Sequence, residues 1–204
     1  MNKDLCEKLN LMIENPVCEL NYNADYELLI AVMLSAQCTD KRVNMVTKEL
    51  FDKYSLKDIA NLDIKETEKI IKSLGSYTKK AAYMKAIANS LLENYDGKVP
   101  NNREYLESLP GVGRKTCNVV LSELFDVPTI AVDTHVERVS KRIGLAKEKD
   151  DVHIIEKKLM KAFDEKDYNR VNHQLVLFGR YICTAKNPNC DKCLIGCKHK
   201  KTKE

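Results

Sequence analysis

We predict an all-α fold for this sequence from three observations. Apolar residues recur at helical spacing along most of the chain, 31% of the residues are charged, and there are only 7 Gly and 5 Pro with no Trp. The 204 residues and an apolar content of 44% can fill one compact domain, or two small ones that share a core. We therefore expect helices joined by short turns.

Three helices are expected in the first third of the chain. Their apolar spacing places them at 25–37, 41–54 and 64–74. Asp25 is placed to cap the first, and Asp63 with Glu66 matches a capping box for the third. Gly75 stands where the end of a helix favours a positive φ.

The same periodicity continues to residue 181. It predicts further helices at 79–95, 102–109, 114–125, 134–144, 152–163 and 169–181. Asn101, Asp133 and Asp151 are placed to cap three of these helices. The run VPTIAV at 127–132 is rich in β-branched residues, but no second such run could pair with it, so we do not expect a strand there.

The charge distribution and the lengths of the apolar runs indicate the location and the kind of partner to expect for this protein. No apolar run approaches the roughly 20 residues that cross a bilayer, and the N-terminus MNKDLCEKLN lacks the apolar segment of a signal peptide. We expect a cytosolic protein that does not bind membranes. The net charge is +4, and several lysines lie near the C-terminus, with Asp191 the one acidic residue among them: Lys186, Lys192, Lys198, Lys200, Lys201 and Lys203. Such a run is either a solvated tail or a surface for a polyanion.

The stretch LPGVGRKT, residues 109–116, joins a short predicted helix to a longer one. Gly111 and Gly113 allow backbone angles and close approaches that a side chain would block, and the second helix starts there with unpaired amides and a positive dipole. This arrangement can hold a phosphate. A tight turn between two helices is the alternative, but a turn requires neither the second glycine nor Arg114 and Lys115.

The eight cysteines fall into two groups. Cys6, Cys18, Cys38 and Cys117 have no regular spacing and are expected to be small buried or half-buried residues. The other four form the pattern C-x6-C-x2-C-x3-C: Cys183, Cys190, Cys193 and Cys197. In a cytosolic chain this pattern indicates a metal site rather than two disulfides. Its spacing alone suits either zinc or a 4Fe-4S cluster.

Four segments together resemble the helix-hairpin-helix DNA glycosylases, specifically their endonuclease III branch. They are ELLIAVMLSAQCTDKRVN, LPGVGRKTCNVV, IAVDTHVERV and GRYICTAKNPNCDKC, in that order. The resemblance implies a six-helix barrel domain at 20–128 that contains the hairpin. It also implies a second helical domain, made of 1–19 and 129–204, that carries a 4Fe-4S cluster. DNA would lie in the cleft between them.

The chemistry of this family points to two catalytic residues. Base removal followed by strand cleavage requires a nucleophile that forms a Schiff base with the sugar C1′, and an amine does this. Lys115 is the candidate, and we expect burial and Arg114 to favour its neutral form. The resemblance assigns the supporting carboxylate to Asp133, which is also a plausible N-cap. The alternative for Lys115 is a phosphate-binding lysine.

DNA contacts follow from the same resemblance. Gln37 is expected to fill the space that an extracted base leaves, although a surface glutamine could also stand there. Gly111, Gly113 and Arg114 of the hairpin, together with His135, are expected to contact DNA. Lys186 and Lys192 are expected to face phosphates. The family often has an apolar side chain where this sequence has Ser76, so we assign no inserted side chain at that position.

The resemblance favours a 4Fe-4S cluster on Cys183, Cys190, Cys193 and Cys197, with zinc as the alternative. The interval between the last two cysteines is two residues shorter than the family's usual five.

The sequence thus predicts a monomeric base-excision-repair enzyme that acts on double-stranded DNA with a damaged base or an abasic site. It would remove oxidised pyrimidines and cleave the strand, in the nucleoid of a prokaryote. The alternatives are a monofunctional adenine or mismatch glycosylase and a non-catalytic DNA-binding protein. Lys115 argues against the former, which lacks an amine there and, in the adenine branch, carries a glutamate where this chain has Ala31.

Overall fold

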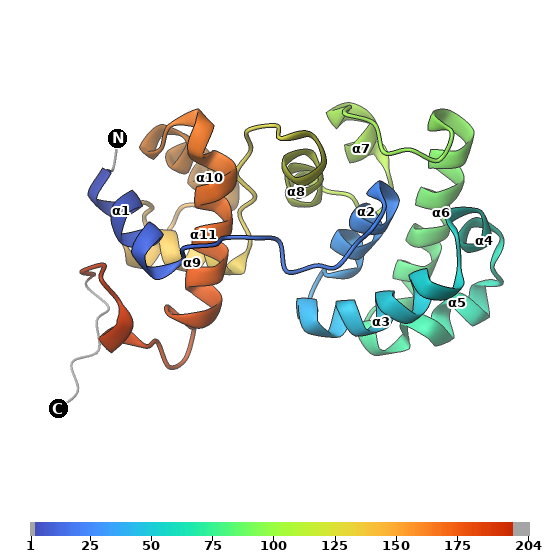
Figure 1. Ribbon diagram of the computed structural model, residues 1–204, viewed down its shortest axis with the longest axis horizontal. Coiled ribbons are helices and arrows are strands. Elements are labelled where there is room, and N and C mark those ends of the chain that lie inside the picture. Colours follow the sequence, from blue (N-terminus) through green and yellow to red (C-terminus); the bar gives the residue numbers. More distant parts are fainter. Residues whose placement is uncertain (1–2, 198–204) are drawn as a thin grey trace. The chain divides into compact units, whose positions relative to one another are not determined.

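The computed structural model describes residues 3–197, and all regular structure within that range is helical (Figure 1). The predicted all-α class is confirmed. The fold comprises two compact units: an internal unit, Cys18–Phe125, and a terminal unit that combines the residues up to Val17 with those from Asp126 onward. Among the described residues, no helix is long and apolar enough to cross a membrane. Lys198, Lys200, Lys201 and Lys203 of the basic stretch lie outside the described residues.

The internal unit is built around one helix that is buried along most of its length. Its elements are α2 (Asp25–Leu34), α3 (Asp40–Lys53), α4 (Leu56–Asn61), α5 (Ile64–Ile71), η1 (Lys72–Leu74), α6 (Tyr77–Tyr95), α7 (Arg103–Ser108) and α8 (Arg114–Phe125). Every residue of α2 from Glu27 to Leu34 is buried, and α3, α6 and α8 all pack against this helix. A helix that is apolar on every side is stable only in such a core position.

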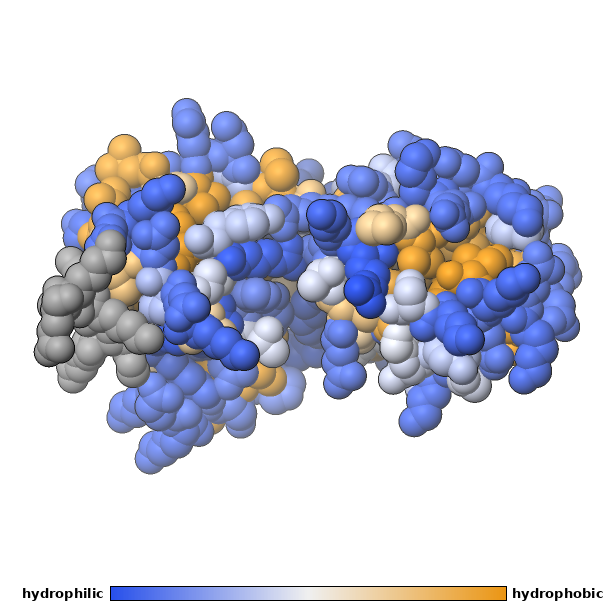
Figure 2. All heavy atoms as spheres, turned by 90° about the horizontal axis from the view of Figure 1, so that it is seen from below, coloured by the Kyte–Doolittle hydropathy of each residue, from blue (hydrophilic) through white to orange (hydrophobic). Residues whose placement is uncertain are grey.

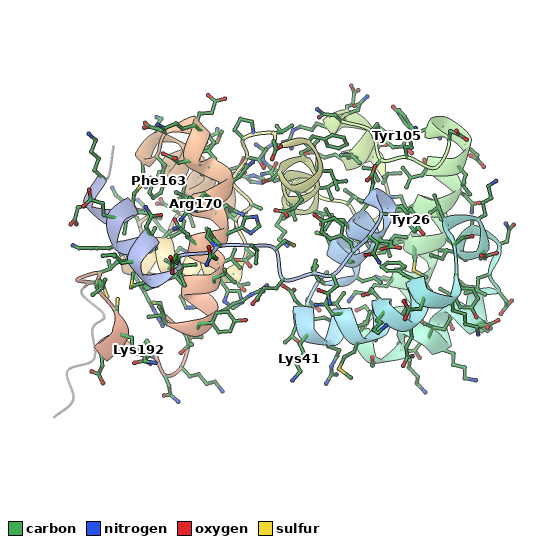
Figure 3. All side chains as sticks on the ribbon, in the orientation of Figure 1. Tyr26, Lys41, Tyr105, Phe163, Arg170 and Lys192 are labelled. Atoms are coloured by element: carbon green, nitrogen blue, oxygen red, sulfur yellow. The ribbon has the colours of Figure 1, made fainter. Side chains whose placement is uncertain are left out.

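The terminal unit is organised by its last long helix. Its elements are α1 (Lys3–Met12), α9 (Thr134–Arg142), α10 (Val152–Ala162), η2 (Glu165–Asp167), α11 (Tyr168–Tyr181) and η3 (Cys190–Lys192). α11 packs against α1 and α9, with Phe178 in the core. Arg170 on α11 also ties down α1, because it donates to Asn10 Oδ1 at 3.1 Å and to Glu14 O at 3.0 Å (Figure 3).

Most helix starts lie where the sequence predicts them. Asp63, Asp133 and Asp151 each accept hydrogen bonds from two amides of the following turn, so these predicted caps are confirmed. Asp25 is not a cap, because it lies inside α2. Glu27 instead reaches back, and its Oε2 accepts from Asn23 N at 2.6 Å.

Three further details of the predicted helices are wrong. Asn102, rather than Asn101, caps α7, and its Oδ1 accepts from Tyr105 N at 3.1 Å. The first predicted helix stops at Leu34, because Gln37 has a φ of 59° and cannot continue it. The short helix α4 was not predicted; its start is capped by Ser55, whose side chain accepts from Asp58 N.

The run at 127–132 is extended but forms no strand, as the sequence predicts. Side chains of α11 supply its hydrogen-bond partners in place of a neighbouring strand. Thr129 N donates to Asn169 Oδ1 at 3.3 Å, and Ala131 N donates to Asn172 Oδ1 at 2.9 Å. Because buried backbone amides need acceptors, these two asparagines fix the path of the segment that ends at Asp133.

The two units are defined by packing contacts within the chain and do not by themselves test the expected domains. Their borders lie at Cys18 and Phe125, whereas the family resemblance placed the domains at 20–128 and 1–19 with 129–204. Those domain assignments stay a prediction. The visible faces of the units are mostly hydrophilic, with smaller apolar areas between (Figure 2), as expected for amphipathic helices around a core.

Candidate active site

The glycine motif forms a hairpin between two helices of the internal unit. α7 ends at Ser108 and α8 begins at Arg114. Val112 is buried at the tip, and its amide donates to Leu109 O at 3.1 Å. The carbonyl of Gly113 accepts the first bond of α8, from Cys117 N at 2.9 Å. The amides of the first turn of a helix have no acceptor within the helix, so this start can receive an anion.

The two glycines of the hairpin serve different purposes. Gly111 has a φ of +79°, and a Cβ there would lie 2.6 Å from Tyr83 Cδ2 and 3.1 Å from Met33 Cγ. Both the turn and the packing therefore require glycine at this position. A Cβ on Gly113 would have no atom within 4 Å. Packing within the protein does not require Gly113, which leaves its backbone open to a partner.

We expect alanine substitutions to separate these two purposes. Gly111→Ala should lower the free energy of unfolding by about 1–3 kcal/mol, because Tyr83 and Met33 must move. Gly113→Ala should lower it by less than about 1 kcal/mol but weaken binding to duplex DNA. Thermal unfolding and fluorescence-anisotropy titrations measure the two effects. Equal destabilisation by both variants would contradict the division.

Lys115 lies in the first turn of α8, and its side chain is exposed, as is that of Arg114. The expectation that Lys115 is buried is therefore wrong for the protein without DNA. Burial raises the pKa of Cys18 to about 11, and the charge of Lys115 opposes this shift only weakly.

Gln37 belongs to the same unit but to a different loop, between α2 and α3. Its side chain is exposed, and its φ of 59° lies in the left-handed region, which glutamine seldom adopts. The loop beyond η1 repeats this conformation, since Ser76 has a φ of 43° and is also exposed.

Asp133 caps α9 in the terminal unit. Its Oδ1 accepts from His135 N and from Val136 N, each at 2.8 Å. These two bonds hold the half-exposed carboxylate in one orientation. Both of these bonds use Oδ1. Capping and catalysis are compatible at this residue.

His135 lies next to the cap and is tied to an arginine. Its Nδ1 is 3.2 Å from Arg138 Nη2. Because a guanidinium can only donate, Nδ1 is the acceptor in this pair and the ring proton resides on Nε2. Gly179 of α11 permits this close packing, since a Cβ there would lie 2.9 Å from His135 Cβ.

The four cysteines of the C-terminal pattern line one pocket, whose wall also includes Arg142 and Ile182. Cys183 is buried, and Cys190, Cys193 and Cys197 are half-buried. Burial raises the pKa of Cys193, and the other three thiols of the pattern raise it further. Between residues 3 and 197, no three His, Cys, Asp or Glu side chains are grouped tightly enough to share one metal ion.

Two arginines that the sequence analysis did not single out hold this loop against α9. Arg138 donates to Gly179 O at 2.7 Å and to Cys183 O at 3.2 Å. Arg142 donates to Thr184 O at 2.8 Å, and its Nη1 lies 3.4 Å from Cys183 Sγ. The helix that starts at Asp133 is therefore the same helix that supports the cysteine loop. A spacing of four residues places both arginines on one face, which is the signal that could have identified them.

The remaining predicted contacts are surface lysines. Lys186 and Lys192 are exposed on the loop after α11, and Lys192 is marked in Figure 3.

The structure thus groups Gly111, Gly113, Arg114 and Lys115 in one hairpin. It groups Asp133 and His135 at the start of α9, and the four cysteines around one pocket. Gln37 lies on a loop of its own.

Comparison with known proteins gives one consistent result. Residues 30–165 match the family model described as HhH-GPD superfamily base excision DNA repair protein. The chain is 47% identical to endonuclease III of Bacillus subtilis over 188 residues, which cover 92% of this chain and 86% of the relative. It is 43% identical to endonuclease III of Escherichia coli over 182 residues, 89% of this chain and 86% of the relative.

Solved structures agree with this result. A trapped endonuclease III–DNA covalent intermediate, an estranged-adenine complex, is 45% identical with a TM-score of 0.89, covering 96% of this chain and 93% of that chain. A thermostable thymine-DNA glycosylase is 25% identical with a TM-score of 0.84, covering 95% and 93%. The resemblance found in the motifs is confirmed: this chain belongs to the endonuclease III family of the HhH-GPD base-excision DNA repair proteins.

Proposed function

We infer that this chain is a bifunctional DNA glycosylase and abasic-site lyase of base excision repair, which acts on double-stranded DNA. We propose that it removes oxidised pyrimidines, with Lys115 as the nucleophile. The observation that carries the proposal is the exposed amine at the start of α8, immediately after an anion-binding turn. A relative at 45% identity was trapped covalently on DNA, which is the behaviour that a Schiff base produces.

The proposed reaction proceeds in two steps. Lys115 Nζ, in its neutral form, attacks the sugar C1′, and the bond from C1′ to the base breaks, with the electron pair leaving on the base. The nitrogen loses its proton and the sugar ring opens to give an iminium ion. Removal of a proton from C2′ then expels the 3′ phosphate by β-elimination, and water releases the cleaved strand from the lysine.

Asp133 supports the first step in this proposal. Its Oδ1 is committed to the α9 cap, so its Oδ2 is the atom that stabilises positive charge at the sugar or accepts the proton from Lys115. The two amides hold the carboxylate still, which lowers the cost of orienting it during the reaction.

Contacts to the DNA backbone are proposed for the hairpin and for the basic side chains. The amides that follow Gly113 bind one phosphate without reading sequence, and Arg114 adds charge beside them. His135 can donate from Nε2, because Arg138 occupies Nδ1. Lys186 and Lys192 are exposed and add salt-dependent affinity. Gln37 enters the duplex where the damaged base leaves it.

We propose that the cysteine pocket holds a 4Fe-4S cluster. We propose Cys183, Cys190, Cys193 and Cys197 as its ligands, because all four line one pocket despite the short interval before Cys197. The spacing of the four cysteines suits either metal group, and the similarity to endonuclease III favours the cluster over zinc. When bound, the cluster would cross-link the loop, and Arg142 would donate toward the sulfur of Cys183.

Iron content tests this assignment. Protein purified without oxygen should contain about four iron atoms per chain and absorb at about 400 nm. Cys197→Ala should lose that absorption. Cys6→Ala is the matched control, since Cys6 is half-buried in the same unit but lies outside the pocket. A colourless preparation that contains zinc would contradict the assignment.

Substrate preference separates the three candidate functions. The chain should release an oxidised pyrimidine from duplex DNA and be trapped on that DNA by borohydride. A monofunctional adenine or mismatch glycosylase would release its base without being trapped, and a binding protein would release nothing. Ala31 stands where the adenine branch carries a glutamate, and it is fully buried in α2. A panel of duplexes with different lesions therefore tests the proposal directly.

A further inference from the structure

A buried lysine connects two loops of the internal unit that each contain a residue with a left-handed backbone conformation. Lys80 lies in α6, and only 6% of it is exposed. Its Nζ donates to Ala36 O at 2.8 Å and to Leu74 O at 2.7 Å, and it lies 3.5 Å from Cys38 Sγ. An ammonium has three N–H donors, so all of them have a partner here.

The two carbonyls that accept hydrogen bonds from Lys80 each lie just before a residue with a positive φ. Ala36 immediately precedes Gln37, and Leu74 precedes the pair Gly75 and Ser76. Gln37 and Ser76 have φ values of 59° and 43°, which are unfavourable for residues other than glycine. Such conformations persist only where the surroundings hold them, and Lys80 supplies part of that restraint.

A second group joins the two loops. Cys38, which follows Gln37, donates from Sγ to Leu74 O at 2.7 Å. This carbonyl therefore accepts hydrogen bonds from both Cys38 and Lys80. Arg42 of α3 adds a longer bond, from Nη1 to Ser73 O at 3.4 Å. The Gln37 loop and the Ser76 loop are therefore linked through contacts from Lys80 and Cys38 that converge on the carbonyl of Leu74.

An apolar side chain could fill the place of Lys80 without burying a charge. Burial of a charge is costly, so an ammonium is tolerated here only because Ala36 O, Leu74 O and Cys38 Sγ together satisfy its three donors. The hydrogen bonds of Lys80 restrain the backbone next to Gln37 and therefore the position of its exposed side chain.

We propose that Lys80 is a positioning residue, which with Cys38 braces the Gln37 loop against the Ser76 loop and so holds the Gln37 side chain in place to enter DNA when a base is extracted. The proposal rests on the DNA-inserting role proposed above for Gln37. Preformed geometry matters because a misplaced group loses much of its effect on a reaction. Lys80 itself touches no DNA in this proposal.

Lys80→Met tests the proposal in the full-length enzyme. Release of an oxidised pyrimidine from duplex DNA should fall on the order of 10-fold. Cleavage at a preformed abasic site should fall much less, since no base needs to be extracted. In the Gln37→Ala background, Lys80→Met should cause no further loss. Amide exchange at Cys38, whose N donates to Ser35 O at 2.9 Å, should accelerate in DNA-free Lys80→Met.

Lys85→Met is the matched control. Lys85 lies on the same helix and also donates to a backbone carbonyl, that of Leu62, which belongs to neither loop. This variant should leave the ratio of base release to abasic-site cleavage unchanged. Cys38→Ala is the milder perturbation in case Lys80→Met does not fold: it should lower the same ratio, and Cys38→Ser, which retains a donor, should restore it.

Several results would overturn the proposal. Equal losses in both reactions, additive losses in the Lys80→Met and Gln37→Ala double variant, or unchanged exchange at Cys38 would each do so. The proposed function is judged separately. If Gln37→Ala alone leaves base release intact, then the role of Gln37 fails and the positioning role fails with it. If the unaltered enzyme releases no base, the substrate assignment fails instead.

Discussion

Lys115→Ala is expected to abolish borohydride trapping on DNA that contains an abasic site or an oxidised pyrimidine. The Schiff base requires an amine at C1′, and alanine leaves no nucleophile at the start of α8. Base release and strand cleavage should both fall on the order of 10³-fold or more, as expected when a covalent nucleophile is lost. Gel separation of the covalent complex and single-turnover cleavage measure the two effects.

Arg114→Ala provides the control for this loss. Arg114 lies in the same exposed turn and carries the same charge, so its removal should weaken DNA binding without preventing trapping. Lys115→Ala should still bind duplex DNA, because the hairpin amides remain. Trapping that survives in Lys115→Ala would show that another amine is the nucleophile, and the assignment of Lys115 would then fail.

Asp133→Asn is expected to reduce base release by about 10²- to 10⁴-fold while leaving the fold intact. Asparagine caps a helix about as well as aspartate does, so the bonds from His135 N and Val136 N should persist. Only the negative charge is lost. Single-turnover kinetics on an oxidised pyrimidine, together with thermal unfolding, measure both quantities.

Asp133→Ala separates the two roles of this residue. It should lose base release to a similar extent and, in addition, about 1 kcal/mol of stability, because no side-chain oxygen caps α9. Asp151→Ala loses a cap of the same kind at α10 and should destabilise the protein without a comparable effect on catalysis. If Asp133→Asn retained full activity, Asp133 would be a cap only.

The local features of the fold could be predicted well because they depend on neighbours in sequence. Amphipathic spacing located most helices, and Asp63, Asp133 and Asp151 were identified as caps from the residues that follow them. The prediction failed where a signal was short or ambiguous. α4 has six residues, and at the start of α2 the side chain of Glu27, rather than that of Asp25, bonds the free amides.

The candidate site was predictable where one motif carried both the turn and the chemistry. LPGVGRKT places Lys115 at the start of α8, and VDTH places Asp133 at the cap of α9. The exposure of Lys115 was not predictable, because a lysine in the first turn of a helix can point into a core or into solvent. The separate purposes of Gly111 and Gly113 depend on Tyr83 and Met33, which are distant in sequence.

The helical class, the order of the helices, the hairpin with its lysine, the capping aspartate and the grouping of the four cysteines could all be read from local sequence patterns. The contacts of Lys80 with Ala36, 44 positions away, and of Arg142 with Thr184, 42 positions away, became visible only in the folded chain. The difference lies in the distance along the chain over which each interaction acts. Helix formation and capping act over about four residues, whereas a buried donor finds its acceptor only after distant helices have packed.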